Sequence, residues 1–341
     1  MKSKIIKFIL FIPLLLGIVP LTSCRKDDNE NKITIAEVTH SLFYAPMYVA
    51  KEKGFFNEVG LEVDIVTTPG ADKVMAALLS KDADIGLMGP EATVYVHQNG
   101  QKDYAVNFAQ LTQKDGSFLL GRDKVDNFSY DLLIGKTIIG GRKGGMPEMT
   151  LEYILKKNGL TITQNGENPN ADVNIRTDVS FDATTGVFVA GESDYCTAFE
   201  PIGTQIEKQN KGHIIASLGD LLNEEVPYTC FSSLKSFMDK NEDKLIKFTK
   251  AIIKGLEYVN SSETKDIIPY LKKDFSTSDE EELTKVINNY KSIEAWPTTM
   301  NFTEDSFNKL IDIVKEAEEL DKEVIVPYET LVTDKFIKQA K

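Results

Sequence analysis

Three features of this sequence could do chemistry with a small molecule: a glycine-rich loop, a glutamate that precedes a proline, and a group of aromatic side chains. The loop runs from Gly140 to Gly145 with the sequence GGRKGG, between a strand-like and a helix-like segment. Its backbone N–H groups and the dipole of the following helix would bind an anion or a polar end of a ligand, and Arg142 and Lys143 would add positive charge. The alternative is that the glycines only permit a tight turn and that both cations are solvated.

Glu200 stands directly before Pro201, which we expect to begin a helix after the strand-like segment Tyr195 to Thr197. In that strand-to-helix turn a carboxylate would face a cleft and accept hydrogen bonds from an amino group on a ligand ring. The alternative is that Glu200 only complements the helix N-terminus, which is worth about 0.3 to 1 kcal/mol. The sequence alone leaves both roles open.

Aromatic side chains occur where they could sandwich a flat ligand. They are Phe43, Tyr44, Tyr195, Phe199 and Tyr228. Because aromatic residues more often belong to a core, we expect about half of them to be packing residues. Trp296, the only tryptophan, is expected to pack between C-terminal helices.

Motifs of common enzyme classes are mostly absent. The glycine loop is followed by Met146 and Pro147, where a phosphate-binding loop needs Lys and then Ser or Thr. No G-x-G-x-x-G or G-x-S-x-G pattern occurs. The three histidines, His40, His97 and His213, are isolated, and no Cys or His pair has zinc-ligand spacing. We therefore expect neither cofactor nor metal and no catalysis, although a Ser-His-Asp set assembled by folding stays open.

These residues need a scaffold, and the segment Ile33 to Ile65 predicts its first part, a βαβ unit. Hydrophobic residues from Ile33 to Val38 predict a strand, Ala45 to Lys53 predicts a helix that stops at Gly54, and alternation from Leu61 predicts a second strand parallel to the first.

The loop between the first strand and the helix is a candidate binding loop, because α/β proteins bind ligands at the carboxyl ends of their strands. It exposes Ser41, Phe43 and Tyr44 just before the helix N-terminus, where unpaired backbone N–H groups point outward.

Strand and helix patterns alternate through the first two thirds of the chain and turn helical from Leu234 onward. This predicts α/β layers with mostly parallel sheets and a helical C-terminal third. Further strands are expected at 85–88, 104–108, 117–120, 131–139, 173–175, 195–197 and 213–216, with helices at 147–157, 181–190 and 201–209. Ser278 with Glu281 resembles a capping box, and Thr303 is expected to start a helix that runs to about Leu320.

The opening segment resembles the substrate-binding proteins of ABC importers that serve sulfonates, nitrate, taurine and thiamine pyrimidine precursors. The shared residues are AP-x-YVA-KEKG-FF and GL-x-V, followed in order by Ala83-Asp84-Ile85-Gly86, Gly135-Lys136-Thr137-Ile138, Gly145-Met146-Pro147 and Phe199-Glu200-Pro201. The resemblance spans Ile33 to about Ser232. Because the matched residues mainly build the fold, they identify the family better than the ligand.

The resemblance implies a two-lobed periplasmic-binding-protein fold of type II, in which the chain crosses between lobes twice. Residues 33–116 and 228–341 would form lobe one and residues 117–227 lobe two, with the ligand cleft between them. The candidate ligand-binding residues are Ser41, Phe43, Tyr44, Pro69, Gly89, Glu91, Gln110, Arg142, Gly144, Gly145, Tyr195, Phe199, Glu200 and Tyr228.

The N-terminus predicts an exported lipoprotein. Lys2, Lys4 and Lys7 form a basic region before an apolar run, so residues 1–23 are expected to be a signal peptide. The sequence before Cys24 resembles a bacterial lipobox, which predicts lipidation of Cys24 and a lipid-anchored location on the extracytoplasmic face of the cell membrane. The apolar run is shorter than the ~20 residues that a bilayer span needs. Residues 24–32 are too polar to fold and are expected to be a solvated tether.

The formal charge is −13, and removal of the three signal-peptide lysines takes it to −13 − 3 = −16. This acidity argues against nucleic acid and against an anionic membrane surface as binding partners. Apart from Cys24, the chain has two cysteines, Cys196 and Cys230. The sequence does not decide whether they form a disulfide, because it does not show the distance between them.

The favoured function is a monomeric transport binding protein that closes two lobes over a small molecule and delivers it to the permease and ATPase subunits of an ABC importer. The alternatives are an enzyme of pyrimidine biosynthesis on the same fold and a ligand-sensing domain of a membrane receptor. For the ligand we favour a thiamine pyrimidine precursor or a similar amino-heteroaromatic, because Glu200 would repel an anion and the candidate loops are aromatic. Sulfonate, taurine or nitrate is the alternative ligand class.

Overall fold

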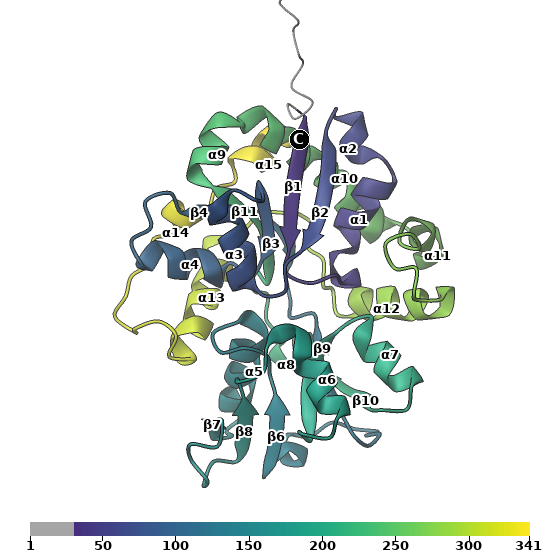
Figure 1. Cartoon of the computed structure of the whole chain (residues 1–341), viewed down its shortest axis with the longest axis vertical. Helices are drawn as coiled ribbons and strands as arrows, with labels where there is room; N and C mark the ends of the chain where they lie inside the picture. The colour runs from purple at the N-terminus through teal and green to yellow at the C-terminus, as the bar shows by residue number, and fades with distance from the viewer. Residues whose placement is uncertain (1–30) are drawn as a thin grey trace, which may run out of the picture. The chain divides into compact units, whose positions relative to one another are not determined.

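The computed structural model describes residues 31–341 of the chain. Within this range the strands form a five-stranded sheet in the order β2-β1-β3-β11-β4 and a six-stranded sheet in the order β10-β5-β9-β6-β8-β7. Helices flank both sheets (Figure 1). The predicted α/β fold class with a helical C-terminal third is confirmed. None of the helices in this range is long and apolar enough to cross a membrane.

The predicted signal peptide, Cys24 and most of the predicted tether lie outside the described residues. The expected tether boundary is corrected at its end, because Lys32 already belongs to the first strand and pairs with Glu62. Its ammonium group forms an ion pair with Asp64 at 2.5 Å.

The first sheet combines a parallel βαβ arrangement with one inserted strand. Its strands are β1 (Lys32–Glu37), β2 (Glu62–Thr67), β3 (Ile85–Met88), β4 (Ala105–Thr112) and β11 (Thr229–Leu234). Ile35 of β1 pairs in parallel with Ile65 of β2, as predicted, and also with Ile85 of β3. β11 lies antiparallel between β3 and β4. The sequence analysis does not predict β11, because all six of its residues are buried and no polar alternation marks it.

The helices that follow the first strands are η1 (Leu42–Tyr44), α1 (Ala45–Glu52), α2 (Phe55–Glu58), α3 (Ala71–Ser80) and α4 (Glu91–Gln98). The predicted helix from Ala45 is α1. Gly54 ends it in the left-handed conformation, with φ 80°, which a residue with a side chain rarely adopts.

The second sheet is parallel in its centre and antiparallel at one side. Its strands are β5 (Ser117–Gly121), β6 (Lys136–Ile139), β7 (Ile162–Gln164), β8 (Val173–Arg176), β9 (Tyr195–Phe199) and β10 (His213–Ser217). β6 pairs in parallel with β8 and β9, whereas β5 is antiparallel to both β9 and β10. β7, a short strand at the sheet edge, is not predicted from the sequence.

The helices of this part are η2 (Tyr130–Leu133), α5 (Met146–Lys157), η3 (Phe181–Ala183), α6 (Thr184–Val189), α7 (Ile202–Lys208) and α8 (Leu218–Leu222). The strand expected at 131–139 is wrong in its first half, which is the 3-10 helix η2. Gly135 breaks the extended conformation with φ 74°, and Ile134 is 49% exposed. The apolar run from 131 to 139 is therefore not a single buried strand.

The remaining helices are α9 (Lys235–Lys240), α10 (Glu242–Ser261), α11 (Thr264–Ile267), η4 (Ile268–Tyr270), α12 (Glu280–Ser292), α13 (Glu304–Glu316), α14 (Tyr328–Leu331) and α15 (Lys335–Ala340). α10 packs on α1, while α14 and α15 pack on β4, so the C-terminal third covers the first sheet. α13 also contacts α5, beside the second sheet.

The helix caps correct one prediction and confirm another. Asp279, not Ser278, is the N-cap of α12, and its side chain accepts a hydrogen bond from the backbone N–H of Glu282. Thr303 caps α13 as predicted, but the helix ends at Glu316 rather than near Leu320.

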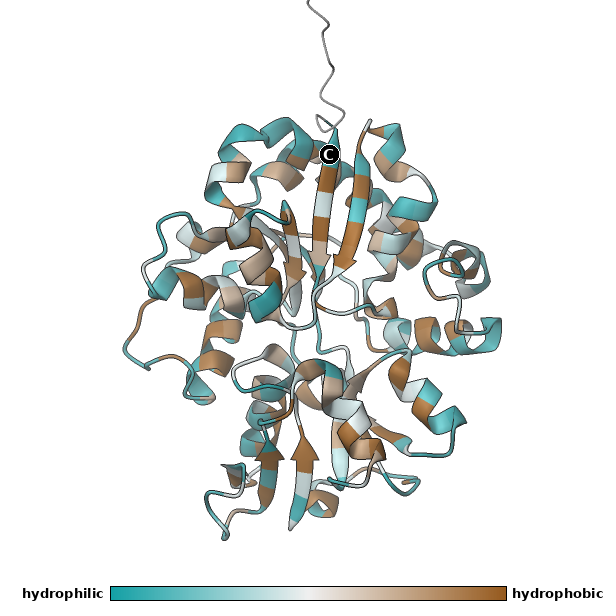
Figure 2. Ribbon diagram, viewed as in Figure 1, coloured by the Kyte–Doolittle hydropathy of each residue, from teal (hydrophilic) through white to brown (hydrophobic). Residues whose placement is uncertain are grey.

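The strands of both sheets carry many hydrophobic residues, whereas hydrophobic and hydrophilic residues alternate along the helices (Figure 2). Cys196 on β9 and Cys230 on β11 are free thiols buried in different sheets. The disulfide that the sequence left open is therefore not formed.

Candidate ligand-binding site

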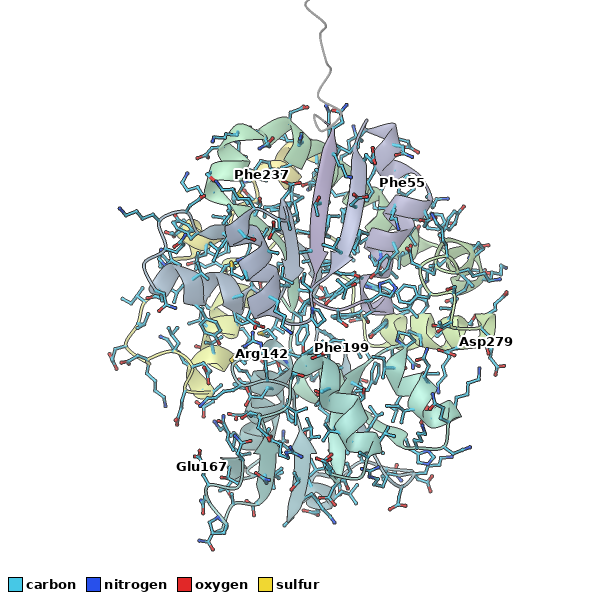
Figure 3. The ribbon with its side chains drawn as sticks, in the orientation of Figure 1. Phe55, Arg142, Glu167, Phe199, Phe237 and Asp279 are labelled. Atoms are coloured by element: carbon cyan, nitrogen blue, oxygen red, sulfur yellow. The ribbon has the colours of Figure 1, made fainter. Side chains whose placement is uncertain are left out.

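A pocket lies where loops from the two sheets meet. It is lined by Val38, Thr39, Tyr44, Gly70, Ala71, Gly89, Glu91, Gly141, Arg142, Gly145, Met146, Pro147, Phe181, Phe199, Tyr228 and Thr229. Val38 directly follows β1, Gly89 follows β3, and Phe199 ends β9. The pocket therefore occupies the carboxyl ends of strands from both sheets, the usual ligand position in α/β proteins. Figure 3 shows Arg142 and Phe199 between the two sheets, whereas Phe55, Phe237 and Glu167 lie at the periphery.

Aromatic side chains form much of the pocket wall. Phe199 lies with its ring centroid 6.1 Å from that of Phe181 and 6.3 Å from that of Tyr228. Tyr44 also lines the pocket, and its hydroxyl is buried. Phe181 is a residue that the sequence analysis missed, because η3 follows a loop without any motif.

Two of the predicted aromatic residues do not line this pocket. Phe43 is completely buried behind the wall and packs on Tyr290 with ring centroids 5.1 Å apart. Tyr195 lies at the start of β9, the opposite end from Phe199, and its hydroxyl donates to the carbonyl of Leu132 at 3.2 Å. The prediction that Tyr195 lines the ligand pocket is corrected, because Tyr195 is the first residue of β9 and lies at the amino end of the strand.

Glu91 is the buried carboxylate of the pocket. Its side chain belongs to a residue only 1% exposed, and Oε2 has no hydrogen-bond partner among the described residues. Burial raises the pKa of this carboxyl to about 7, against the opposing effect of the positive charge on Arg142 and of backbone N–H groups. Gly89 lies close beside it, and a Cβ there would lie 2.0 Å from Oε2 of Glu91, so the carboxylate would have to move.

The glycine loop joins β6 to α5 as predicted, and the backbone N–H groups of Gly144 and Gly145 already have partners. Gly144 donates its backbone N–H to Oε2 of Glu148 at 3.1 Å, and Pro147 has no N–H. Arg142 lines the pocket, and its Nε lies 3.0 Å from Oδ1 of Asp72 on α3. Lys143 instead lies 3.8 Å from Glu319 and is not among the lining residues. Gly144 lies beside the pocket without lining it, and its carbonyl accepts from the Tyr95 hydroxyl at 3.1 Å.

Glu200 is fully buried, and both carboxylate oxygens are occupied. Thr204 donates its backbone N–H to Oε2 and its hydroxyl to Oε1, each at 2.8 Å, and Asn289 donates to Oε1 at 3.3 Å. Burial raises its pKa, and these hydrogen bonds oppose the shift. The expectation that Glu200 accepts from a ligand is corrected, since the carboxylate completes the N-terminus of α7 and lines none of the pockets described here.

The remaining candidates do not line this pocket. Ser41 is buried, and its hydroxyl donates to the carbonyl of Glu200 at 2.6 Å. Pro69 lines an adjoining groove of about 790 Å³ that shares Phe181 and Phe199 with the main pocket. Gln110 lines a separate groove of about 1290 Å³ beside Trp296. The Trp296 indole N–H donates to the carbonyl of Phe43 at 2.8 Å, so Trp296 contacts the loop after β1.

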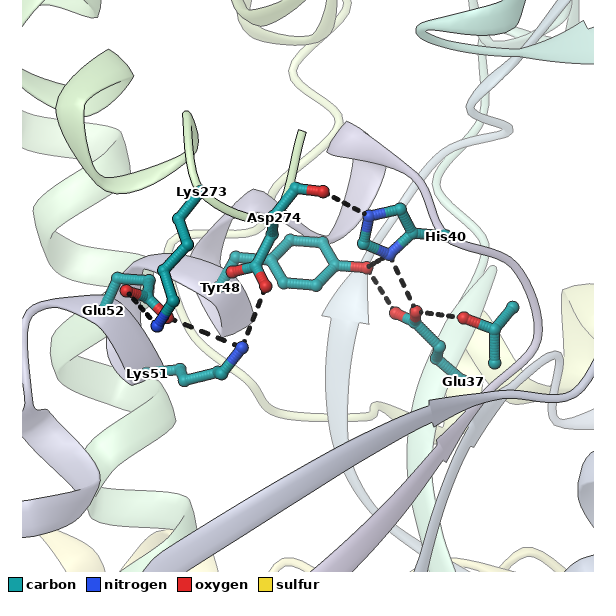
Figure 4. A network of polar contacts seen from close by, with 8 residues as sticks. Glu37, His40, Tyr48, Lys51, Glu52, Lys273 and Asp274 are labelled. Carbon is teal, nitrogen blue, oxygen red and sulfur yellow. Dashed lines mark hydrogen bonds and ion pairs between the residues drawn. The ribbon is translucent and has the colours of Figure 1, made fainter. Parts of the chain in front are cut away.

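A polar network at the edge of the adjoining groove fixes the loop after β1 (Figure 4). Nε2 of His40 lies 2.9 Å from the carbonyl oxygen of Asp274, and Nδ1 lies 3.0 Å from Oε1 of the buried Glu37. Tyr48 donates its proton to Oε2 of Glu37. Both ring nitrogens of His40 therefore face acceptors, which describes the imidazolium form. The hydrogen bond to Glu37 raises the pKa of His40 accordingly.

The comparisons with known proteins agree with this architecture. A model of the NMT1-like family matches residues 27–270. A protein of Bacillus subtilis (strain 168) named "Putative binding protein YtlA" is 41% identical over 319 residues, which cover 94% of this chain and 92% of that protein. The chain belongs to the NMT1-like family.

Solved structures show the same fold in more distant proteins. The alkanesulfonate-binding protein SsuA from Xanthomonas axonopodis pv. citri, bound to MOPS, has a TM-score of 0.69 at 15% identity, covering 89% of this chain and 98% of that one. The periplasmic nitrate-binding protein NrtA from Synechocystis PCC 6803 has a TM-score of 0.69 at 14% identity, with coverage of 91% and 88%. The periplasmic-binding-protein fold predicted from the sequence is confirmed.

Proposed function

We propose that this protein is an extracytoplasmic solute-binding lipoprotein of an ABC importer, which captures a small ligand and delivers it to the permease and ATPase subunits. The observation that carries the proposal is the pocket lined by strand ends of both sheets, in a chain of the NMT1-like family. The names of the SsuA and NrtA proteins that share its fold support a role in solute capture.

In this proposal residues 33–116 and 228–341 form lobe one and residues 117–227 form lobe two. The chain passes from β4 of the first sheet to β5 of the second, and returns between β10 and β11, which gives two crossings for a hinge. Ligand contacts with both lobes favour a closed state over an open one. Ser41 with the carbonyl of Glu200, and Asp72 with Arg142, are contacts that opening must break.

For the ligand we propose a thiamine pyrimidine precursor or a similar amino-heteroaromatic. The support is the aromatic wall of Tyr44, Phe181, Phe199 and Tyr228, which offers π-faces to a flat ring. The alternative, a sulfonate, taurine or nitrate, would use Arg142 and the N-terminus of α5. Hydrogen bonding of Gly144 to Glu148 and the missing N–H of Pro147 leave fewer donors for such an anion.

The test is a thermal-shift screen of the mature protein against pyrimidines, flavins, sulfonates, taurine and nitrate, followed by solution X-ray scattering with each stabilising compound. A ligand that bridges the lobes should raise the melting temperature by mass action and shrink the radius of gyration. Tyr195→Phe is the matched control, since its side chain is remote from the pocket. An unchanged radius of gyration at saturating ligand would contradict closure.

The proposed anchor has its own test. Cys24→Ala should remove lipid labelling and either release the protein from the membrane or leave its signal peptide uncleaved. A Cys24→Ala protein that is processed and still labels with lipid would contradict the lipoprotein assignment.

A further inference from the structure

We propose that Glu91 determines ligand specificity: its free carboxylate oxygen accepts a hydrogen bond from an amino or protonated ring nitrogen of the ligand, and its charge rejects sulfonate-type anions. This inference rests on the proposed function, because it assigns the ligand chemistry of the same pocket. It also replaces Glu200 as the acceptor.

The position of the carboxylate is the first argument. Glu91 begins α4 directly after the Gly89-Pro90 turn at the end of β3, and its side chain lines the pocket although the residue is 1% exposed. The backbone N–H groups of Glu91, Ala92 and Met146 stabilise the charged form. Those donors explain a helix-capping role for the carboxylate, yet Oε2 still has no partner among the described residues.

An unsatisfied buried oxygen is the second argument. Buried polar atoms are nearly always hydrogen-bonded, and one that is not loses the solvation it would have in water without replacement. A ligand that brings an N–H donor to Oε2 would restore that bond inside the pocket. A ligand without a donor would leave the oxygen unsatisfied and would displace any water able to reach it.

The charges around the pocket are the third argument. The positive charge of Arg142 favours the ionised form of Glu91, but Nε of Arg142 already lies 3.0 Å from Oδ1 of Asp72. Above pH 7, where Glu91 is mostly ionised, these three groups together carry a net charge of −1. An anion would therefore meet a negative site, whereas a cation or a strong N–H donor would balance it.

The aromatic wall narrows the ligand class further. Phe181, Phe199 and Tyr228 line the same pocket as Glu91. A flat heterocycle can stack on these rings while its exocyclic amino group points to the carboxylate. A 4-aminopyrimidine has both parts, whereas a sulfonate or nitrate has neither an N–H donor nor an aromatic face.

Calorimetric titration of the mature protein with three probes tests the inference. The probes are 4-amino-2-methylpyrimidine, 2-methylpyrimidine without the amino group, and methanesulfonate. We expect the wild type to bind the aminopyrimidine at least about tenfold more tightly than the ring without it, the usual discrimination when a buried acceptor loses its donor. Methanesulfonate should give no heat of binding.

Glu91→Gln keeps the size of the side chain but removes its charge. It should weaken aminopyrimidine binding by about tenfold to a hundredfold, the range for a hydrogen bond to a charged group. Glu200→Gln is the matched control, a buried glutamate at another strand-to-helix turn, and it should leave the dissociation constant unchanged. Circular dichroism of both variants shows whether they fold, and Glu91→Asp, which keeps the charge but withdraws the oxygen, should bind with intermediate affinity.

The outcomes separate the inference from the proposed function. Equal aminopyrimidine affinity in Glu91→Gln and the wild type, or wild-type binding of methanesulfonate alone, would overturn the role of Glu91 while leaving solute capture intact. Wild-type binding of none of the three probes would also overturn this ligand assignment. The transport function is then decided separately by co-purification of the mature protein with its permease.

Discussion

Glu91 and Glu200 both lie buried in a strand-to-helix turn beside a proline, yet their carboxylates are in opposite situations. Glu91 follows Pro90 and is the first residue of α4, whereas Glu200 precedes Pro201, the N-cap of α7. Glu200 is fully hydrogen-bonded by Thr204 and Asn289. Oε2 of Glu91 is buried without a partner among the described residues, and Glu91 lines a pocket.

The difference teaches that the same local motif can either build the fold or keep a carboxylate available. Thr204, three residues into α7, supplies both an N–H and a hydroxyl to Glu200. Beside Glu91 stands Gly89, which offers no side chain that could bond Oε2. Whether the carboxylate is satisfied thus depends on neighbours rather than on the glutamate itself.

The largest expected effect is on stability when Glu200 is removed. Glu200→Ala would leave the N–H and hydroxyl of Thr204 and the amide of Asn289 without their acceptor, so we expect the free energy of unfolding to fall by about 4 kcal/mol. Urea denaturation at pH 7 measures the change. A loss of less than about 1 kcal/mol would mean that the bonds to Glu200 are not structural.

Substitution of Glu91 should stabilise the protein at high pH, whereas substitution of Glu200 should destabilise it. The pKa of Glu91 is raised from 4.5 to about 7 in the folded state. The free energy of unfolding therefore falls as the pH rises above 4.5, and this decrease is complete above pH 7. Glu91→Gln should therefore be more stable than the wild type at pH 8, by about 2 to 3 kcal/mol, and equal to it near pH 4. Thermal unfolding at both pH values checks this, and destabilisation at pH 8 would contradict it.

Glu37 is a third buried carboxylate, and its partner can titrate. Because the folded pKa of His40 is raised above 6.5, the stabilisation from the pair is present below pH 6.5 and is lost as the pH rises through the folded pKa. His40 is 40% exposed, so the effect should stay below about 1 kcal/mol. His40→Gln should remove this pH dependence, as measured by melting temperatures from pH 5 to 9, and an unchanged slope would contradict the assignment.

The smallest effect is expected at the far end of β9. Tyr195→Phe removes only the hydrogen bond to the carbonyl of Leu132, at 3.2 Å, so stability should fall by about 0.5 to 1 kcal/mol. Ligand affinity should be unchanged, whereas Phe199→Ala at the other end of the strand should weaken it. Equal losses of affinity in the two variants would contradict the placement of the pocket.

The sequence predicts the scaffold well because hydrophobic periodicity and turn residues mark it. The βαβ unit from β1 to β2 and the helix after the glycine loop lie where expected, while the fully buried β11 carries no alternating pattern. The site is predicted less completely. The sequence predicts both Phe43 and Phe199 as aromatic pocket residues. Tertiary packing buries Phe43 behind the pocket wall and leaves Phe199 in the wall.

The roles of the two glutamates depend on contacts between distant parts of the chain. Asn289, which bonds Glu200, lies on α12, and Met146, whose N–H stabilises Glu91, starts α5. No local pattern encodes such pairings. The sequence therefore favours Glu200 as the ligand acceptor and offers Glu91 only as a further candidate, whereas the structure occupies both oxygens of Glu200 and places Glu91 in the pocket lining.

The ion pair between Arg142 and Asp72 has a consequence for the rate at which a bound molecule leaves. It joins the glycine loop to α3 across the pocket, and its side chains are 28% and 56% exposed, so dissolved ions reach it. Screening weakens such exposed pairs as ionic strength rises, since the Debye length falls to about 3 Å at 1 M salt. At high ionic strength we therefore expect the ligand to dissociate faster, with a smaller change in its association rate. The salt concentration outside the cell would then control how quickly the protein releases its ligand.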